Sequence, residues 1–546
     1  MRYDNDLGDH SVEALALAEQ QLIRNANIGA RQGALQSSVE NFRVFTEASG
    51  TSGGFEQNLV GFLGRLKYDY ANKYLITASV RRDGTSTFAP GNRWGTFPSV
   101  SAGWRIGQEP FMEAVPALTS LKLRGSWGQL GNSASVGPYS YLSTINTCCG
   151  TYSVGDESFF TSDPTGNGFV NKELSWETVE TVDFGLSAGL FDDRLTFGAT
   201  YYRRDTNDLL YNVAISNVSG FGSAPVNLGN VRNTGVELEA GYTDEVGEVT
   251  FNIDGNLTTT NNELTRLREG IDVFARGIYR TEVGQPIGSF FGYKTDGIIN
   301  TQQELEDARA LEDDLANAEP QMGDVKFVDL ATPCTSANTG PDLPCEEGQR
   351  ILREPDGEIT DADRTFIGKT IPDITYGFNF DINWRQFDFG VFFQGETGVQ
   401  RYNQFRRFNL GLGGGGNNQL AASQDRYSED NPDGDLPRAV ATDPNNNTRF
   451  SDLWVEDAGY LRLKNVQLGY SIPPSLASGA FQQARLYVSV SNVFTLTPYE
   501  GLSPTARAYD PTGIQNGQVN NQLRAGTDTG LLGMPRTYRV GIQLQL

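Results

Sequence analysis

The strongest constraint in this sequence is an alternation of apolar and polar residues with a period of two, which dominates from about Leu59 onward. Successive side chains of a β-strand point to opposite faces, so a segment of this kind folds as a strand with one apolar and one polar face. The clearest case alternates Phe378, Phe380, Ile382 and Trp384 with Asn379, Asp381, Asn383 and Arg385. Gly, Asn, Asp and Pro separate such segments, as they do in turns. We count roughly 14 to 16 of them, more than one β-sandwich normally holds.

Strands with one apolar and one polar face are compatible with two architectures, a β-sandwich and a transmembrane barrel. The segment around 236–242 places Val236, Leu238, Ala240 and Tyr242 against Glu237 and Glu239. Such a polar face meets bulk water in a β-sandwich but lines a polar lumen in a transmembrane barrel. Residues 132–175, 262–370 and 400–458 form long connections that alternate with turns of a few residues, which favours extracellular loops and periplasmic turns of a barrel. One long connection contains TQQELEDARALEDDLANAE, for which we expect a short helix.

Composition excludes several classes of protein. The hydrophobic fraction is 38% and the mean hydropathy is -0.40. No apolar run approaches the roughly 20 residues of a spanning helix, whereas a barrel strand needs only about 10 residues of alternating polarity. The net charge is -24. Binding to nucleic acid requires clustered Lys and Arg, so we expect no nucleic-acid partner.

Catalytic and redox sites find little support. The single histidine, His10, lies far in sequence from any candidate nucleophile, and no C-x-x-C pair occurs. Glu237 and Glu239 could be imagined as a glycosidase pair, but carboxylates are also expected on any polar barrel lumen. We therefore predict that the chain is not an enzyme. The chain has four cysteines, Cys148, Cys149, Cys334 and Cys345. Their even number suits disulfides within loops, and four free thiols are the alternative.

Long sequence blocks carry a family resemblance and keep one order along the chain. They include GRLKYDYANKYLITASVRRDGTSTF, NRWGTFPSVSAGWRIGQEPFM, LTSLKLRGSWGQLGN, NKELSWETVETVDFGLSAGLFDDRLTFGATYYRRDTNDLLY, NVRNTGVELEAGY, VGQPIGSFFGYKTDGI, IGKTIPDITYGF, YLRLKNVQLGYSIP, LYVSVSNVFTLTPYEGLSP and PRTYRVGIQLQL. In sequence and in order these blocks resemble SusC/RagA-type TonB-dependent outer-membrane transporters of Bacteroidota-like bacteria. The resemblance extends to the final residue.

The resemblance implies a fold, a location and a set of partners. It implies an all-β fold, a transmembrane antiparallel barrel of roughly 22 strands with long extracellular loops, of which this chain holds about 14 to 16. It also implies a location in the cell outer membrane, in contact with its lipid. The implied partners are a SusD-like surface lipoprotein, TonB acting through a plug segment, and a glycan or peptide ligand. Residues 1–546 correspond to the carboxy-terminal part of such a receptor, and we expect the plug domain and signal peptide to be absent. LGDHSVEALALAEQQ has helical propensity, yet the resemblance places a strand there, which we adopt.

The orientation of several side chains relative to the barrel wall can be predicted. The last strand places Tyr538, Val540, Ile542, Leu544 and Leu546 on one face, and Lys122 and Arg124 are expected in the lumen. Aromatic residues near turns are expected to form membrane girdles for the most part, with stacking platforms for sugars as the alternative. These residues are Trp94, Phe97, Trp104, Trp127, Tyr201 and Tyr202.

One acidic stretch resembles the EF-hand-like calcium loop that precedes the YGF strand in this family. Asp356, Gly357, Glu358, Ile359, Thr360 and Asp363 would fill loop positions five to nine and twelve, with Asp329 and Glu354 for the first and third. An insertion at 331–352 interrupts the loop and contains Cys334 and Cys345. Calcium is therefore a candidate cofactor, and an ordinary acidic turn is the alternative.

The leading functional hypothesis is uptake of an oligosaccharide, peptide or similar nutrient, with this chain supplying barrel wall and extracellular loops. A secreted or surface β-rich binding or adhesive protein is the alternative from another class, and a polysaccharide-active enzyme of several sandwiches is a third. Membrane partition distinguishes them, because only a barrel requires lipid.

Overall fold

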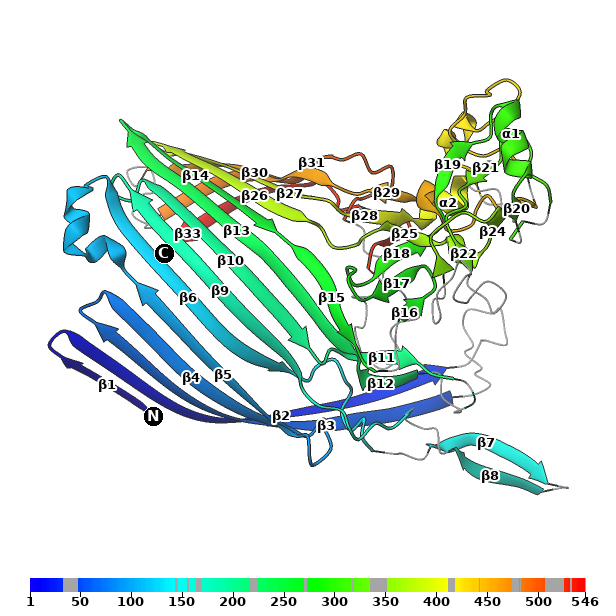
Figure 1. The fold of residues 1–546 in the computed structure, drawn as a ribbon. Helices are drawn as coiled ribbons and strands as arrows, with labels where there is room; N and C mark the ends of the chain where they lie inside the picture. Colours follow the sequence, from blue (N-terminus) through cyan, green and yellow to red (C-terminus); the bar gives the residue numbers. More distant parts are fainter. Residues whose placement is uncertain are drawn as a thin grey trace, which may run out of the picture.

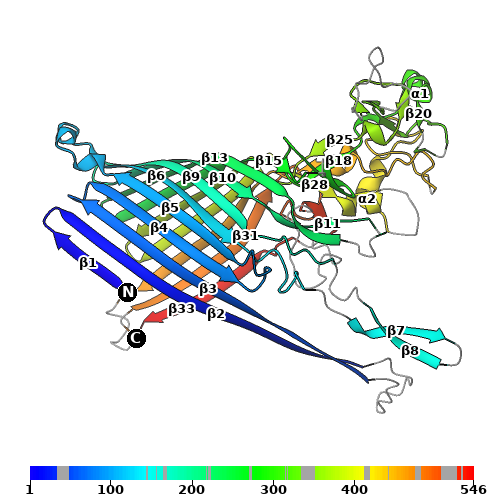
Figure 2. The same ribbon diagram turned by 60° about the horizontal axis from the view of Figure 1, so that its bottom comes forward.

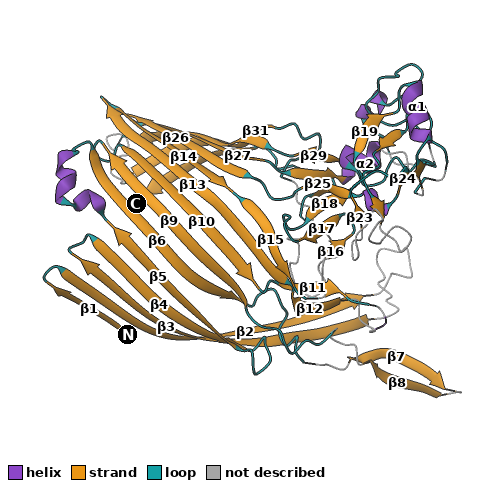
Figure 3. Ribbon diagram, viewed as in Figure 1, coloured by secondary structure: helices purple, strands orange, loops and turns teal. Residues whose placement is uncertain are grey.

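The fold is described from a computed structural model. It describes residues 1–32, 48–142, 146–154, 157–163, 169–216, 218, 223–269, 273–313, 315–316, 318–333, 351–410, 418–440, 442–473, 481, 483–505, 525–530 and 533–545. Strands of one large antiparallel sheet dominate, and the sheet curves into a wall that carries a body of smaller elements at one end (Figures 1 and 3). Among the described residues, no helix has the length and apolar character needed to span a membrane.

The large sheet has 16 strands. In pairing order, 15 of them are β1 (Arg2–Leu7), β2 (His10–Gln32), β3 (Ala48–Tyr70), β4 (Tyr74–Thr85), β5 (Trp94–Trp104), β6 (Leu118–Asn132), β9 (Glu177–Leu190), β10 (Leu195–Asn207), β13 (Gly229–Val246), β14 (Val249–Thr259), β26 (Ile374–Trp384), β27 (Phe387–Thr397), β30 (Tyr460–Ile472), β31 (Gln483–Leu496) and β33 (Thr537–Gln545). The remaining strand, β15 (Asn261–Leu267), pairs with β13. The count lies in the predicted range, and β2 confirms the strand expected over LGDHSVEALALAEQQ.

The period-two pattern places apolar side chains on the outside of the wall. Phe184 on β9 lies opposite Tyr201 on β10 and is 62% exposed. Its neighbour Asp183 faces the other way and accepts a hydrogen bond from Ser126 at 3.0 Å. Tyr538, Val540, Ile542 and Leu544 share one exposed face of β33, as predicted, and Leu546 lies outside the described residues. One face of the wall therefore suits lipid and the other suits a polar lumen.

The two ends of the wall differ in the length of their connections. At one end, tight turns such as 8–9, 247–248 and 385–386 join neighbouring strands. Gly247 has a φ of 66°, in the left-handed region that tight antiparallel hairpins require. At the other end lie the long connections, and the carboxy terminus lies at the short-turn end, whereas Met1 lies part-way along the wall beside Ala16 (Figure 2). The short-turn end is the periplasmic end by the rule for outer-membrane barrels.

Aromatic residues mark both borders of the lipid-facing band. Tyr70, Tyr74 and Trp104 stack in series at the periplasmic border. Trp94 stacks with Phe62 and lies beside Gly84 at the opposite border. Residues 74 to 84 span about 33 Å at about 3.3 Å per residue, and a strand tilt of about 45° reduces this to about 23 Å. That depth matches an apolar band of about 25 Å.

Two aromatic residues differ from the girdle prediction. Trp94, Trp104, Trp127 and Tyr201 lie on the outer face, but Phe97 and Tyr202 point inward and are buried. Phe97 packs edge-on against Trp176, and the Tyr202 hydroxyl donates to the Thr259 carbonyl at 3.1 Å. Each occupies the inward parity of its strand, so the pleat rather than proximity to a turn decides its direction.

The long connections fold into small sheets and helices rather than running as bare loops (Figure 3). Hairpins form from β7 (Asn146–Val154) with β8 (Glu157–Asp163), and from β11 (Leu210–Ala214) with β12 (Ser223–Asn227). Between β14 and β26 lie β16 (Val273–Arg276), β17 (Tyr279–Glu282), β18 (Ser289–Gly292), β19 (Thr295–Ile298), α1 (Gln302–Arg309), β20 (Glu312–Asp313), β21 (Val325–Phe327), β22 (Thr332–Pro333), β23 (Ile351–Leu352), β24 (Glu358–Ile359), η4 (Asp361–Asp363) and β25 (Thr365–Gly368). Later elements are β28 (Gln400–Asn403), α2 (Gln404–Leu410), η5 (Ala421–Asp425), η6 (Asp452–Trp454), β29 (Val455–Asp457) and β32 (Thr527–Asp528). Helix α1 confirms the predicted helix, and its Thr301 and Glu304 form a capping box.

The position of Ile253 on the outer face generates a stability prediction. Ile253 lies opposite Tyr242 and Phe380, whereas Asn256 on the same strand faces the lumen. We expect Ile253→Arg to lower the free energy of unfolding by about 2–4 kcal/mol, because it places a charge in the apolar band. Asn256→Arg should change it by less than about 1 kcal/mol. Urea titration of the receptor refolded into phospholipid vesicles measures both, and equal losses would contradict the assignment of faces.

Candidate functional site

A folded body, here called the loop domain, stands at the extracellular end of the wall. It comprises the described residues of 273–370 and 400–458, from the connections β14–β26 and β27–β30 (Figure 1). Its apolar interior contains Phe290, Tyr402, Leu410, Leu436 and Trp454 in one cluster and Tyr293, Val325, Phe327 and Ile359 in another. Two loops distant in sequence therefore share one interior and fold together.

A buried ion pair joins these two connections. Asp324 is fully buried, and its carboxylate accepts two hydrogen bonds from Arg438, at 2.6 Å from Nε and 3.1 Å from Nη2. Asn447 Nδ2 donates to the same carboxylate at 3.0 Å. Bidentate guanidinium pairing with further hydrogen bonds is the geometry that offsets the cost of burying the Asp324 carboxylate, while the Arg438 side chain is half-buried.

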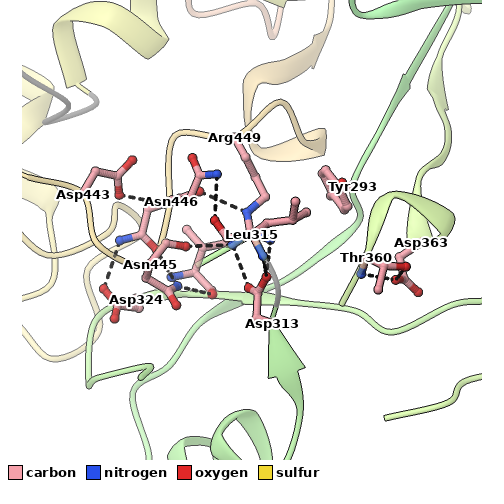
Figure 4. Close-up of polar contacts among 12 residues, drawn as sticks. Tyr293, Asp313, Leu315, Asp324, Thr360, Asp363, Asp443, Asn445, Asn446 and Arg449 are labelled. Carbon is pink, nitrogen blue, oxygen red and sulfur yellow. Dashed lines mark hydrogen bonds and ion pairs between the residues drawn. The ribbon is translucent and has the colours of Figure 1, made fainter. Parts of the chain in front are cut away.

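A second ion pair, drawn in Figure 4, is linked to Asp324 through Asn445 and Asn447. Arg449 donates to both carboxylate oxygens of Asp313, at 3.1 and 2.7 Å, and its side chain is 4% exposed. Its guanidinium lies 3.9 Å from the ring centroid of Phe327. Arg449 therefore links an ion pair to the apolar interior, which fixes the position of the 442–458 segment against strand β20.

A turn at 443–448 holds this network together. The Asp443 carboxylate accepts from the backbone N–H groups of Asn447 at 2.7 Å and Thr448 at 3.0 Å. Asp443 and Asn446 have φ values of 43° and 52°. Asn and Asp tolerate this left-handed conformation better than other side chains, which explains their use in the DPNNNT stretch.

The base of the loop domain attaches to the wall through buried charges. Arg401 is 3% exposed and pairs with Glu396 at 3.4 Å. Glu456 on β29 accepts from Asn403 at 3.0 Å, and burial raises the pKa of its carboxyl. Strand β28 pairs with both β29 and β32, so the connection after β31 also joins this base. The sequence reading did not identify that connection as structured.

The lumenal face of the wall carries charges of both signs. A concave surface near the periplasmic end is lined by Lys67, Arg105, Lys122 and Arg124 together with Asp183 and Glu237. Arg124 donates to Thr200 at 2.7 Å. A neighbouring surface is lined by Asp193, Glu239 and Asp254. The predicted lumenal position of Lys122 and Arg124 is confirmed, and Glu237 and Glu239 lie among the polar groups of that wall.

The acidic turn that resembles a calcium loop folds at the edge of the loop domain. Asp329 accepts from the backbone N–H of Gly357 at 2.6 Å and of Asp356 at 3.1 Å, although 26 residues separate the two segments. Strands β22 and β23 close the intervening insertion where it leaves the turn. Burial raises the pKa of Asp329, and the neighbouring Asp363 and Asp356 add to the shift.

The other predicted ligands lie in the same turn. Buried Asp363 accepts from Leu330 N at 2.7 Å, Ala331 N at 2.9 Å and Thr360 N at 2.7 Å. Glu354, Asp356 and Glu358 are exposed. Within the described ranges, no group of three or more His, Cys, Asp or Glu side chains is arranged to hold a metal ion. Calcium binding stays a prediction. Cys334 and Cys345 lie outside the described residues, so disulfide pairing also stays open.

A two-faced antiparallel wall, aromatic borders, short periplasmic turns and large extracellular connections define an outer-membrane β-barrel protein. The chain belongs to the family described as TonB dependent receptor-like, beta-barrel, whose model matches residues 7–323. It is 31% identical to TonB-dependent receptor P3 of Formosa agariphila, over 100% of this chain and 51% of that protein. It is 28% identical to TonB-dependent receptor SusC of Bacteroides thetaiotaomicron, over 89% of this chain and 44% of that protein.

Solved structures agree on the fold. The RagAB peptide transporter matches with a TM-score of 0.77 at 24% identity, over 100% of this chain and 54% of that chain. The SusC/RagA resemblance is thereby confirmed, as is the outer-membrane location. These relatives are receptors and transporters, which confirms the prediction that the chain is not an enzyme. The chain spans about half the length of the curated relatives it matches.

The sequence analysis missed the ion pairs of the loop domain. Arg438 and Arg449 stand in turn-rich segments without periodicity, and their partners lie more than 100 residues away. Asp and Asn are frequent in the sequence around these two arginines, which indicates a polar cluster. Their frequency does not identify which acid pairs with which base. Only tertiary packing decides that.

The burial of Asp324 generates a prediction for the loop domain. Arg438→Ala should destabilise this domain by about 3–5 kcal/mol, because it leaves a buried carboxylate unpaired. Arg268→Ala is the control, since its pair with Glu173 is exposed and should contribute less than about 1 kcal/mol. Hydrogen exchange of β21 in the purified receptor reports the loss. Unchanged protection in Arg438→Ala would show that the pair does not hold the domain together.

Proposed function

We propose that this chain forms the barrel wall and the extracellular loops of a TonB-dependent importer that takes up an oligosaccharide or a peptide. The observation that carries the proposal is a polar lumenal wall beneath a prefolded loop domain, in a chain of the TonB-dependent receptor family. The wall supplies a water-filled passage, and the loop domain supplies a rigid surface at its mouth. Binding without bond cleavage is the chemistry that these groups support.

One structural neighbour supports the peptide class, and the oligosaccharide class rests on the resemblance to SusC-type receptors. One relative is SusC, and the structural neighbour RagAB is a peptide transporter. A lumen and mouth rich in Asp, Asn, Ser, Thr and Arg side chains can donate and accept hydrogen bonds for glycan hydroxyls or peptide amides. We further propose a SusD-like surface lipoprotein as the partner over the mouth and TonB as the source of energy through a plug segment.

Uptake by the native bacterium tests the proposal. Deletion of the gene that encodes this chain should abolish accumulation of one labelled oligosaccharide or peptide pool. A protonophore should produce the same loss in the wild type, because TonB-driven transport depends on the proton gradient of the inner membrane. Complementation with the unaltered gene is the control. Scintillation counting of washed cells measures the accumulated label.

Two outcomes would contradict transport. Uptake of every pool at wild-type rates in the deletion strain would remove the importer hypothesis. Surface binding of a ligand that is lost on deletion but insensitive to the protonophore would favour the binding or adhesive alternative. Recovery of the intact product in the soluble fraction, without detergent, would do the same.

We also propose that the turn containing Asp329, Glu354, Asp356, Glu358, Thr360 and Asp363 binds calcium. The support is the approach of Asp329 to Gly357, which brings the first and middle positions of the predicted loop together. Asp356→Ala should weaken calcium binding at least about tenfold, since it removes an oxygen ligand. Asp307→Ala on α1 is the control. Isothermal titration of the detergent-solubilised receptor decides, and equal heats in all three proteins would dismiss the site.

A further inference from the structure

One periplasmic connection differs from the tight turns that the structure describes. The tight turns 8–9, 247–248 and 385–386 simply reverse the chain, but residues 105–117 between β5 and β6 form two consecutive 3-10 helices, η1 (Ile106–Gln108) and η2 (Pro110–Ala114). This segment, here called the foot, projects at the short-turn end of the wall (Figures 1 and 2). A compact folded segment in place of a tight turn requires its own explanation.

Contacts of Glu109 place the foot on the lipid side of the barrel. Its carboxylate accepts from the Tyr74 hydroxyl at 2.7 Å and from Trp104 Nε1 at 3.0 Å. Both rings belong to the outward aromatic border and stack on one another with centroids 6.3 Å apart. Glu109 therefore lies against the outer rim of the barrel, whereas Arg105 at the start of the foot still lines the lumenal surface.

The foot is also fixed to the base of β6. A Cβ on Gly107 would lie 2.8 Å from the backbone nitrogen of Leu121, so only glycine permits this close approach. Arg105 donates to the Asn72 carbonyl at 3.0 Å, which ties the start of the foot to the neighbouring turn. The foot therefore has a defined orientation relative to the membrane border.

The foot exposes two large apolar side chains. Phe111 is 61% exposed and Val115 is 45% exposed. Single exposed apolar residues are ordinary on a protein surface, but these two belong to a segment that Glu109 ties to Tyr74 and Trp104 of the aromatic border. The charges nearby balance, with Lys73 and Arg105 against Glu109 and Glu113. Apolar insertion rather than charge would hold such a surface at a membrane.

We propose that the foot lies in the headgroup layer of the periplasmic leaflet, with Phe111 and Val115 inserted among the phospholipid acyl chains. Continuity with the lipid-facing aromatic border identifies phospholipid as the occupant. The foot adds an interfacial anchor beside strands β5 and β6, where turns such as 8–9 and 247–248 offer no such surface. This anchor is independent of ligand, lipoprotein and TonB.

Quenching by brominated lipid tests the foot in the purified receptor reconstituted into phosphatidylcholine vesicles. Phe111→Trp adds one indole to the six native ones. The emission added by this variant should fall at least twofold in vesicles of dibrominated phosphatidylcholine and resist aqueous acrylamide. Glu113→Trp is the matched control, because Glu113 is an exposed, charged position of the same short helix. Its added emission should respond to acrylamide and not to bromine.

Val115→Trp provides a second reporter if Phe111→Trp does not fold, as judged by heat-modifiable migration on gels. Quenching of the added emission by bromolipid at either position supports insertion of the foot into the membrane. Quenching by acrylamide alone at both positions would place the foot in the periplasm and overturn the proposal.

Discussion

The ladder of backbone hydrogen bonds between neighbouring strands is the interaction on which this structure depends. Inside a membrane no water replaces a missing backbone partner, so each strand that crosses the apolar band must be paired along its length. Pairing fixes the register, and the register fixes which side chains meet lipid. The position of every lumenal charge, from Lys67 to Asp254, follows from that constraint.

The distribution of buried apolar groups follows the change of solvent along the barrel axis. Within the membrane the wall directs its apolar side chains outward, so it has no interior of its own. In the part of the chain that the structure describes, buried clusters lie at the extracellular end of the wall, as around Leu264, and in the connections there, as around Trp454. There water surrounds the chain again, so the hydrophobic effect drives a conventional core, and ion pairs such as Asp324–Arg438 specify its arrangement.

The sequence predicted the features that depend on local periodicity. Alternation over 376–385 placed Phe378 and Asn379 on opposite faces, and the polar stretch 301–319 was expected to contain a short helix, which α1 confirms. Girdle positions were expected for most of the six aromatic residues near turns, and Phe97 and Tyr202 are exceptions because they occupy the inward parity of their strands. The loop domain could not be predicted, because its partners meet through tertiary packing between connections that carry no periodic signal.

The insertion at 331–352 begins and ends at one place, since Thr332 pairs with Leu352. A chain segment whose two ends are held together can change in length at a small entropic cost that grows only with the logarithm of its length. The acid-rich turn formed by Asp329 and Gly357 is thereby insulated from whatever lies between them. This point on the receptor surface can accept new sequence, whether through evolutionary drift or as an engineered epitope, without disturbing strand register in the membrane.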